Sequence, residues 1–314
     1  MNYLEPLIHI VTEEEEGLLL KSILRNRMKL SRSLLSKLKQ TEQGITLNGE
    51  RVYTSVAVRA GDKIEIRMVR ESSDDILPQD LPIDIIYEDD HLLVVNKSAG
   101  MIVHPTHGHY TNTLANAVVH HWQVRGEQVR FRPIHRLDQD TSGVLAIAKN
   151  PFVHQHVSEQ MKRNEFEKEY IAFAHNHPIP AEATLSAPID RDLVNPHIRV
   201  VTHDRGYPSV TIYRTERTYC DGHASLIRIW LETGRTHQIR VHMKHIGCPL
   251  IGDKMYGLEG MTELEQLRDN YITRQALHAE KLTFVHPMTG DRMVFKANLP
   301  QDLMALSNQL ETER

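Results

Sequence analysis

Short apolar runs separated by polar turns fill the chain beyond about residue 80, and several have the length and composition of β-strands. They are rich in Val, Ile, Leu and Tyr, and most are bounded by turn-forming or charged residues. The first two are separated by a short segment that contains Glu88-Asp89-Asp90 and are predicted to pair as a hairpin. The predicted strands cover residues 83–87, 92–95, 144–148, 168–173, 210–213 and 226–231.

Helical signals stand between and after these strands. Asn150 is a predicted N-cap, with Pro151 at the first helical position. Thr236 is predicted to cap a helix that ends at Gly247. Residues 303–314 are amphipathic and then polar, which predicts a terminal helix. Residues 180–208 are rich in proline, aspartate and arginine, so we expect irregular structure there.

The N-terminal module, residues 1–75, has a different pattern of two short helices followed by a hairpin. Apolar spacing predicts a helix over residues 20–28 and a second one that begins at the N-cap Ser31. Asn48-Gly49 lies between β-prone segments and is a strong signal for a tight hairpin turn. Residues 63–68 then alternate as a strand.

The two predicted helices of this module are strongly basic. Most charge runs are simply solvated helix faces, but the absence of any acid among residues 21–40 favours contact with RNA. The helices, the hairpin and the segment Ala60-Gly61-Asp62-Lys63-Ile64 together resemble the small RNA-binding domain of the fourth small-subunit ribosomal protein. The basic residues are Lys21, Arg25, Arg27, Lys29, Arg32, Lys37 and Lys39.

The segment Glu71-Ser72-Ser73-Asp74-Asp75 is polar and acidic and is predicted to be a flexible tether. We therefore expect a small RNA-binding domain over residues 1–75, a linker over 76–80 and a larger domain over 81–314.

Composition narrows the class of protein. No apolar run approaches the roughly 18 residues that a membrane span needs. The first 20 residues include four consecutive glutamates, which argues against a secretory signal. The two cysteines are far apart in sequence, so we expect neither a disulfide framework nor a cysteine zinc site. We expect a cytoplasmic location, where thiols stay reduced. The net charge is -4, so contact with RNA would depend on local basic patches.

The segment His135–Gly143 is the richest in candidate chemistry. It is polar, turn-forming and leads into an apolar strand, which places Asp138 and Arg136 at the mouth of that strand. A well-made turn would explain Asp, Thr, Ser and Gly equally well, because these residues supply local hydrogen bonds and permissive dihedrals. From the residues alone, a catalytic loop and a structural turn are about equally favoured.

The segment resembles the active-site motif His-Arg-Leu-Asp-x-x-Thr-Ser-Gly of RNA pseudouridine synthases of the RluA type. Residues 96–105 resemble a further family loop, with Ser98 where proline is usual. Residues 233–242 and 277–290 match later family segments. The resemblance implies an α+β fold with a large mixed, mainly antiparallel β-sheet and flanking helices.

The resemblance also implies roles for individual residues. Asp138 would be the carboxylate at the junction of ribose and uracil, and Tyr170 would stack on the base. Arg235 would be the guanidinium partner of Asp138. His135 and Arg136 would contact RNA, and Arg136 would fill the gap left by a flipped uridine. The implied reaction is an isomerisation, so no cofactor is demanded.

Other functions are less favoured. His104, His107 and His109 lie close together, but zinc prefers four ligands in recognisable patterns, and no second ligand group is evident. A metal-dependent base-modifying enzyme is therefore not expected. The sequence His-Arg-Leu-Asp superficially resembles a kinase catalytic loop, but no glycine-rich nucleotide loop accompanies it. The remaining alternative is a non-catalytic RNA-binding or ribosome-assembly factor, against which Asp138, Tyr170 and Arg235 argue. We expect a monomer acting on ribosomal RNA, with transfer RNA the second choice.

Overall fold

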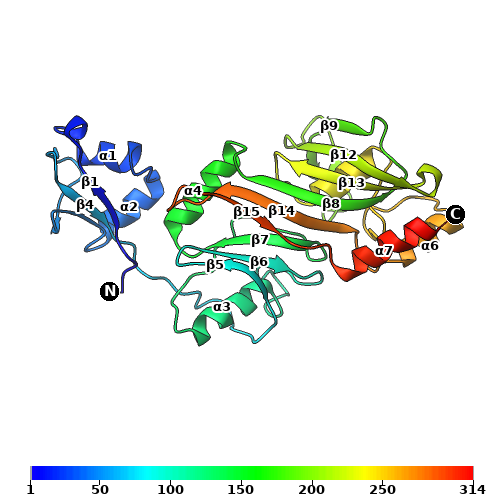
Figure 1. Ribbon diagram of the computed structural model, residues 1–314, viewed down its shortest axis with the longest axis horizontal. Coiled ribbons are helices and arrows are strands. Elements are labelled where there is room, and N and C mark those ends of the chain that lie inside the picture. The colour runs from blue at the N-terminus through cyan, green and yellow to red at the C-terminus, as the bar shows by residue number, and fades with distance from the viewer. Residues whose placement is uncertain (1, 314) are drawn as a thin grey trace.

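The computed structural model describes residues 2–313 (Figure 1). The N-terminal module lies at one end and builds a four-stranded sheet in the order β1-β4-β2-β3, accompanied by two helices. Its elements are β1 (Leu7–Ile10), the 3-10 helix η1 (Glu13–Glu15), α1 (Leu20–Asn26), α2 (Arg32–Gln40), β2 (Ile45–Leu47), β3 (Glu50–Arg51) and β4 (Lys63–Ile66).

Local sequence signals set the geometry of this module as predicted. The Ser31 hydroxyl accepts a hydrogen bond from the backbone N–H of Leu34 at 3.1 Å and so caps α2. Asn48 and Gly49 have φ values of 52° and 85°, the left-handed pair that a two-residue hairpin turn requires. The predicted helices, hairpin and strand are confirmed.

The large domain is built on a nine-stranded sheet in the order β5-β6-β7-β14-β8-β13-β12-β9, with β15 paired to β14. Only the short β7–β14 contact is parallel. The mixed, mainly antiparallel α+β fold is therefore confirmed. The strands are β5 (Asp84–Glu88), β6 (Leu92–Lys97), β7 (Ser142–Ala148), β8 (Glu167–His175), β9 (Glu182–Ser186), β12 (Val210–Tyr219), β13 (Ala224–Leu231), β14 (Leu277–Val285) and β15 (Arg292–Lys296).

Helices flank this sheet. Asn150 caps α4 by accepting a hydrogen bond from the backbone N–H of Val153 at 2.9 Å, as predicted. The helices α3 and α6 were not anticipated from the sequence. The helical elements are α3 (Leu114–Val124), α4 (Pro151–Lys162), the 3-10 helix η2 (Cys220–Gly222), α5 (Gln238–His245), α6 (Glu263–Asn270) and α7 (Gln301–Thr312).

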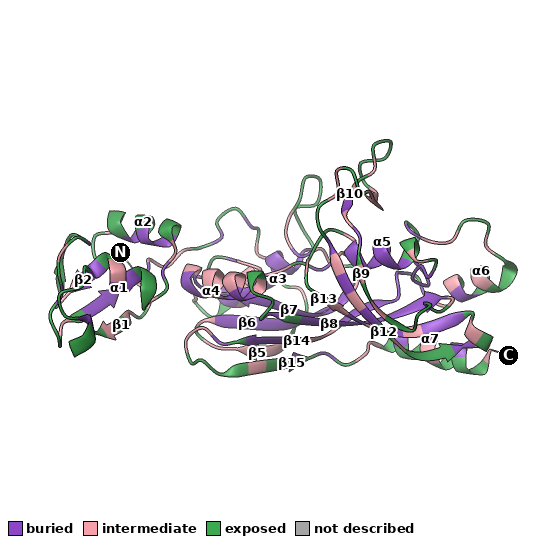
Figure 2. Ribbon diagram, turned by 90° about the horizontal axis from the view of Figure 1, so that it is seen from above, coloured by how far each residue is buried: buried purple, intermediate pink, exposed green. Residues whose placement is uncertain are grey.

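Two predictions of local structure were wrong. Residues 180–208 contain β9 and a separate antiparallel pair, β10 (Ile189–Arg191) and β11 (Arg199–Val201), which projects from the body (Figure 2). Long-range pairing of β9 with β12 overrides the weak local propensity. Helix α5 begins at Gln238 after His237, not after Thr236, because the Gln238 side chain holds the preceding loop by accepting from the backbone N–H of Arg235 at 2.9 Å.

The segment expected to be a flexible tether is instead fixed to the large domain. The Ser73 hydroxyl accepts a hydrogen bond from the backbone N–H of Phe131 at 2.8 Å, and Ile76 is buried. Glu71 pairs with Arg132 of the large domain and Lys37 of α2. Glu71 and Ser73 thus have distant partners, which the local sequence could not reveal.

The N-terminal module also packs directly on the large domain. Gln155 of α4 accepts a hydrogen bond from the backbone N–H of Ser31 at 2.8 Å and donates one to the Lys29 carbonyl at 2.7 Å. Buried apolar residues of α1, α2 and β4 form one continuous core with those of α4, β6 and β7. The module is therefore held by both apolar packing and polar contacts.

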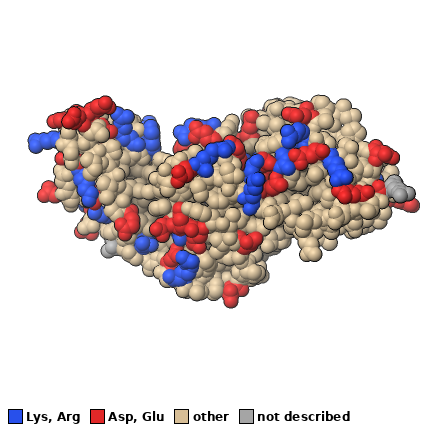
Figure 3. Space-filling view, viewed as in Figure 1, with Lys and Arg blue, Asp and Glu red and all other residues tan. Residues whose placement is uncertain are grey.

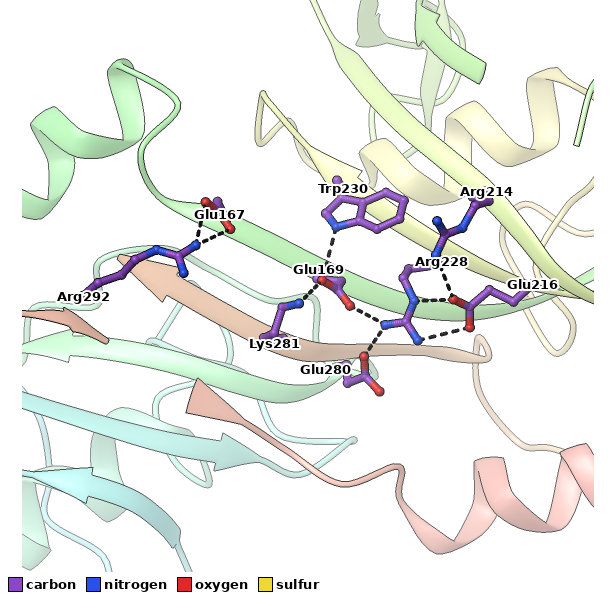
Figure 4. A network of polar contacts seen from close by, with 9 residues as sticks. All are labelled: Glu167, Glu169, Arg214, Glu216, Arg228, Trp230, Glu280, Lys281 and Arg292. Carbon is purple, nitrogen blue, oxygen red and sulfur yellow. Dashed lines mark hydrogen bonds and ion pairs between the residues drawn. The ribbon is translucent and has the colours of Figure 1, made fainter. Parts of the chain in front are cut away.

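The two faces of the large sheet differ in what packs on them, as alternate residues of β8 show. Tyr170 and Ala172 pack with α5, while Ile171 and Phe173 pack with α7. On the same face as Ile171, Glu169 joins a network of ion pairs with Arg228 and Lys281, shown in Figure 4. The central strands are buried along most of their length (Figure 2).

In the part of the chain that the structure describes, no helix has both the length and the apolar character to cross a membrane.

Candidate active site

The loop His135–Gly143 runs into β7 at the centre of the large sheet. Its turn closes with a hydrogen bond from the Thr141 backbone N–H to the Asp138 carbonyl at 3.1 Å. Gly143 has φ of 119°, and a Cβ there would lie 2.2 Å from the Ala279 carbonyl oxygen of β14. Only glycine allows β14 to pass this close, so Gly143 fixes where the loop leaves the sheet.

Lys97 holds the loop from one side. Its ammonium group is buried and donates to the carbonyls of Ser98, Met101 and Gln139 at 2.8, 2.7 and 2.8 Å. Burial lowers the pKa of Lys97 to about 7, although the charge of Asp140 opposes this. Lys97 therefore ties the end of β6 to the residue that follows Asp138.

Arg274 holds the loop from the other side. It donates to the Asp140 carbonyl at 2.9 Å and to the Ser142 hydroxyl at 3.3 Å. Its guanidinium also forms a two-point ion pair with Asp302 at the start of α7, at 2.7 and 3.0 Å. The C-terminal helix is thereby connected to the loop that carries Asp138.

A cavity of about 370 Å³ opens beside this loop. It contains the carboxylate of Asp138, the ring of Tyr170 and several cationic side chains within an otherwise partly apolar wall. The lining residues are Pro133, Ile134, His135, Arg136, Leu137, Asp138, Thr141, Met161, Lys168, Tyr170, Leu231, Gly234, Arg235, His237, Gln238, Ile239, Arg240 and Leu277.

The guanidinium beside Asp138 belongs to Arg240, which corrects the expectation that Arg235 would take this place. Arg240 Nη1 lies 3.5 Å from Asp138 Oδ2. Arg240 also forms a two-point ion pair with the fully buried Asp253, at 2.6 and 2.7 Å, and lies over the ring of Tyr256. Burial alone would lower the pKa of Arg240, but its hydrogen bonds with Asp253 and the charges of both aspartates raise it. Arg240 is therefore a fixed cation.

Arg235 lies at the rim of the same cavity and is exposed. Its Nε donates to the Pro208 carbonyl at 3.2 Å, and its guanidinium lies 5.7 Å from the ring centre of Tyr207. Arg235 and Arg240 are five residues apart in the same motif. The sequence could have told them apart by the start of the helix, because Arg240 lies inside α5 and Arg235 precedes it.

Tyr170 lies in the cavity wall and is 5% exposed. Burial raises the pKa of its hydroxyl, and the charge of Asp138 raises it further. Tyr170 is thus held as a neutral phenol close to that carboxylate.

His135 and Arg136 both line the cavity but differ in environment. Arg136 is exposed, whereas His135 packs edge-on against Phe166 with ring centres 5.4 Å apart. Burial, followed by the charge of Lys168, lowers the pKa of His135 to about 3. His135 is therefore neutral, so a charge-based contact with RNA would fall to Arg136.

The basic residues of the N-terminal module are exposed, as a nucleic-acid contact requires. Two of them have acidic partners from outside the run: Arg27 pairs with Glu15 at 3.1 Å, and Lys37 pairs with Glu71. Figure 3 shows positive and negative side chains interleaved on this face of the molecule. Electrostatic attraction of RNA must therefore come from local groups of basic side chains and not from the charge of a whole face.

No group of three or more His, Cys, Asp or Glu side chains within residues 2–313 is arranged to hold a metal ion. His104 lies against Phe131, with ring centres 5.7 Å apart, and His107 Nδ1 lies 3.4 Å from the Tyr110 hydroxyl.

A sequence model of one family, RNA pseudouridylate synthase, matches residues 91–245, which span the Asp138 loop, β8 and the arginine motif. The chain is 35% identical over 297 residues to YhcT, an uncharacterized RNA pseudouridine synthase of Bacillus subtilis (strain 168), covering 95% of each chain. The chain belongs to the RluA-type RNA pseudouridine synthases. It is therefore an isomerase that acts on RNA.

Other relatives carry a more specific name. Ribosomal large subunit pseudouridine synthase D of Zymomonas mobilis is 42% identical over 238 residues, covering 74% of each chain. The solved structure of human RNA Pseudouridylate Synthase Domain Containing 4 has a TM-score of 0.58 at 22% identity, covering 72% of this chain and 92% of that one. The structural likeness supports the fold, and the sequence identities support the family.

Proposed function

We propose that this enzyme converts specific uridines of large-subunit ribosomal RNA to pseudouridine, with Asp138 as the catalytic carboxylate. The observation that carries the proposal is the position of Asp138, which lies in the cavity next to Tyr170 and within 3.5 Å of Arg240. Its side chain is 27% exposed, so a flipped nucleotide can reach it. No other carboxylate lines this cavity among the described residues.

The reaction breaks the bond between C1′ of ribose and N1 of uracil. A new bond then forms between C1′ and C5, C5 loses its proton, and N1 gains one, so no net oxidation or hydrolysis occurs and no cofactor is required. Asp138 would act at C1′ or the base while Arg240 keeps the carboxylate in position. The ring of Tyr170 would stack on the uracil. Flipping the uridine into the cavity costs a few kcal/mol, which contacts from Arg136 would help to offset.

The names of four relatives support ribosomal RNA as the target, because each is called ribosomal large subunit pseudouridine synthase D. We also propose that residues 1–75 form an RNA-binding module of the kind found in the fourth small-subunit ribosomal protein. The order of two basic helices, a hairpin and a strand supports this assignment. Transfer RNA remains the second candidate.

Asp138→Asn is expected to keep the fold and lose activity, because the amide is isosteric but cannot serve as a nucleophile or base. Tritium at C5 of uridine in a transcript of large-subunit ribosomal RNA is released on turnover, and this release gives the rate. Activity above a few per cent of wild type, with deamidation excluded by mass spectrometry, would contradict the assignment.

Asp140→Asn is the matched control. It makes the same change two residues away in the same loop, and the Asp140 carboxylate forms no hydrogen bond within residues 2–313. We expect it to retain most of the activity. Complete activity loss in both variants would point to a structural role for the loop instead.

A map of pseudouridines in cells lacking the gene, complemented with each variant, would identify the target uridine.

A further inference from the structure

Lys168 lies in the active-site cavity but has no part in the reaction as described above. It precedes Tyr170 by two residues on β8, so the two side chains share the face that borders the cavity. Successive same-face residues on a strand are about 7 Å apart. Lys168 therefore lies one step further along the cavity than Tyr170, whose ring would stack on uracil. The Lys168 side chain is mostly buried, with 8% of the residue exposed.

Lys168 Nζ has no hydrogen-bond or ion-pair partner within residues 2–313, and it is not among the side-chain atoms fully shielded from solvent, so it reaches the cavity. The other buried lysines do. Lys97 donates to three carbonyls, and Lys149 pairs with Glu88 at 3.1 Å and Glu127 at 2.7 Å. An unpaired charge on a side chain that is mostly withdrawn from water is costly to a folded protein. Burial lowers the pKa of Lys168 to about 8, which reflects this cost.

A second donor without an acceptor lies nearby. The backbone N–H of Ala146 points to His135 Nε2 at 3.4 Å, which places the imidazole proton on Nδ1, and Nδ1 is buried without a partner. The charge of Lys168 contributes to the lowered pKa of His135, so the two side chains are neighbours. This end of the cavity therefore carries an unpaired ammonium group, and the neighbouring imidazole offers no free acceptor to match it.

The cavity is open to a ligand at this point. A Cβ added to Gly234 would lie 3.5 Å from Lys168 Nζ, so the glycine backbone borders the ammonium group without a side chain covering it. Arg136 and Arg235 are exposed on the rim of the same cavity. An anion that enters here would meet cations from three different segments.

We propose that Lys168 binds a phosphate of the RNA backbone adjoining the flipped uridine. The inference rests on the proposed function, because it requires a uridine in the cavity. Phosphates are the only anionic groups of RNA, whereas the uracil carbonyls are neutral acceptors that would compensate a buried charge less well. The stability given up by burying an unpaired lysine is recovered when the substrate binds.

Lys168→Met tests the proposal, because it removes the charge and keeps the approximate volume. RNA affinity is measured against salt concentration in an Asp138→Asn background, on a large-subunit ribosomal RNA transcript and on bulk transfer RNA. The slope of log affinity against log salt should become shallower by about 0.7 on the RNA that binds more tightly. With Asp138 intact, Lys168→Met should raise KM about 10- to 100-fold, as loss of one charge-assisted contact predicts, and change kcat less than twofold.

Thermal unfolding separates binding from structure. If Lys168 exists to bind substrate, Lys168→Met should raise the Tm of the free enzyme, because it removes an unpaired buried charge. Lys168→Arg should keep the salt slope of wild type. The control is Lys281→Met, which removes one charge on the opposite face of the sheet, where Lys281 pairs with Glu169, and should leave the slope unchanged.

A lower Tm for Lys168→Met, or an unchanged salt slope, would overturn the proposal. An unchanged slope with raised KM would assign Lys168 to a neutral acceptor of uracil instead. Failure of the proposed ribosomal target is read separately, as absence of tritium release by the wild-type enzyme, and does not affect the binding measurement.

Discussion

Arg240 is the residue that connects the candidate carboxylate to the folded core. Its guanidinium contacts Asp138 on the cavity side and Asp253 on the buried side. The buried pair orients the side chain, so the contact with Asp138 costs little additional ordering. A surface arginine such as Arg235 would have to give up side-chain freedom to make the same contact.

Arg240→Met is expected to impair both folding and activity. Removing one partner of a buried ion pair leaves the Asp253 carboxylate uncompensated, at a cost of about 3–5 kcal/mol. Urea unfolding measures the stability, and tritium release measures the activity of the remaining folded protein. We expect kcat to fall at least 10-fold.

Arg235→Met is the matched variant on the same motif. Arg235 is exposed, so we expect the unfolding free energy to change by no more than about 0.5 kcal/mol. Its effect should fall on RNA affinity rather than on kcat. A larger loss of kcat in Arg235→Met than in Arg240→Met would reverse the roles given to the two arginines.

At the scale of elements, the active-site loop is held by segments far apart in the chain. Lys97 at the end of β6 and Arg274 before β14 each donate to its backbone carbonyls, and Asp302 of α7 orients Arg274. Contacts to backbone position a loop without using the side chains that do chemistry. Helix α7 therefore contributes to the site although none of its residues lines the cavity.

Lys97→Met is expected to lower both Tm and kcat. Three carbonyls lose a charged donor, and we expect a loss of about 2–3 kcal/mol, measured by urea unfolding. The same substitution at Lys168 should change the Tm in the opposite direction, because Lys168 has no acceptor to lose. A rise in Tm for Lys97→Met would show that its hydrogen bonds do not repay the burial of its charge.

At the scale of the whole molecule, the N-terminal module shares a core with the large domain. Deleting residues 1–75 would expose apolar residues of α4, β6 and β7 and remove the contacts of Gln155. Truncation would therefore mix a loss of RNA contacts with a loss of stability. Charge reversal on the module surface avoids this difficulty.

Reversing Lys21, Arg25 and Lys39 to glutamate is expected to weaken RNA binding at least 10-fold. These exposed residues have no ion-pair partner within the described chain, so the substitutions should leave the fold intact. If each contacts one phosphate, the salt slope should fall by about 2 to 3. Filter binding measures both quantities, and tritium release at saturating RNA should change little.

A control triple with the same change in net charge uses Arg217, Arg292 and Lys296 of the large domain. These residues are exposed and lie on β12 and β15. Arg217 pairs with Glu311 and Arg292 with Glu167, so urea unfolding must first show that this triple is folded. Equal loss of affinity in both triples would mean that overall charge, and not the module, governs RNA binding.

Sequence signals worked well where the determining contacts are local. Ser31 and Asn150 cap their helices and Asn48-Gly49 turns its hairpin, since each of these contacts joins residues no more than three apart. Prediction failed where distant partners decide. Residues 182–186 form a strand only because β12 offers an edge, and Glu71 and Ser73 are ordered by Arg132 and Phe131.

The sequence by itself determined the family, the loop that carries Asp138 and the strand that carries Tyr170, because these are encoded in contiguous motifs. Only the tertiary structure decided that Arg240 and not Arg235 lies beside Asp138, and that Lys168 is buried without a partner. An ion pair and a missing ion pair both depend on which segments meet in space. Spacing along the chain carries that information only within a single helix, strand or turn.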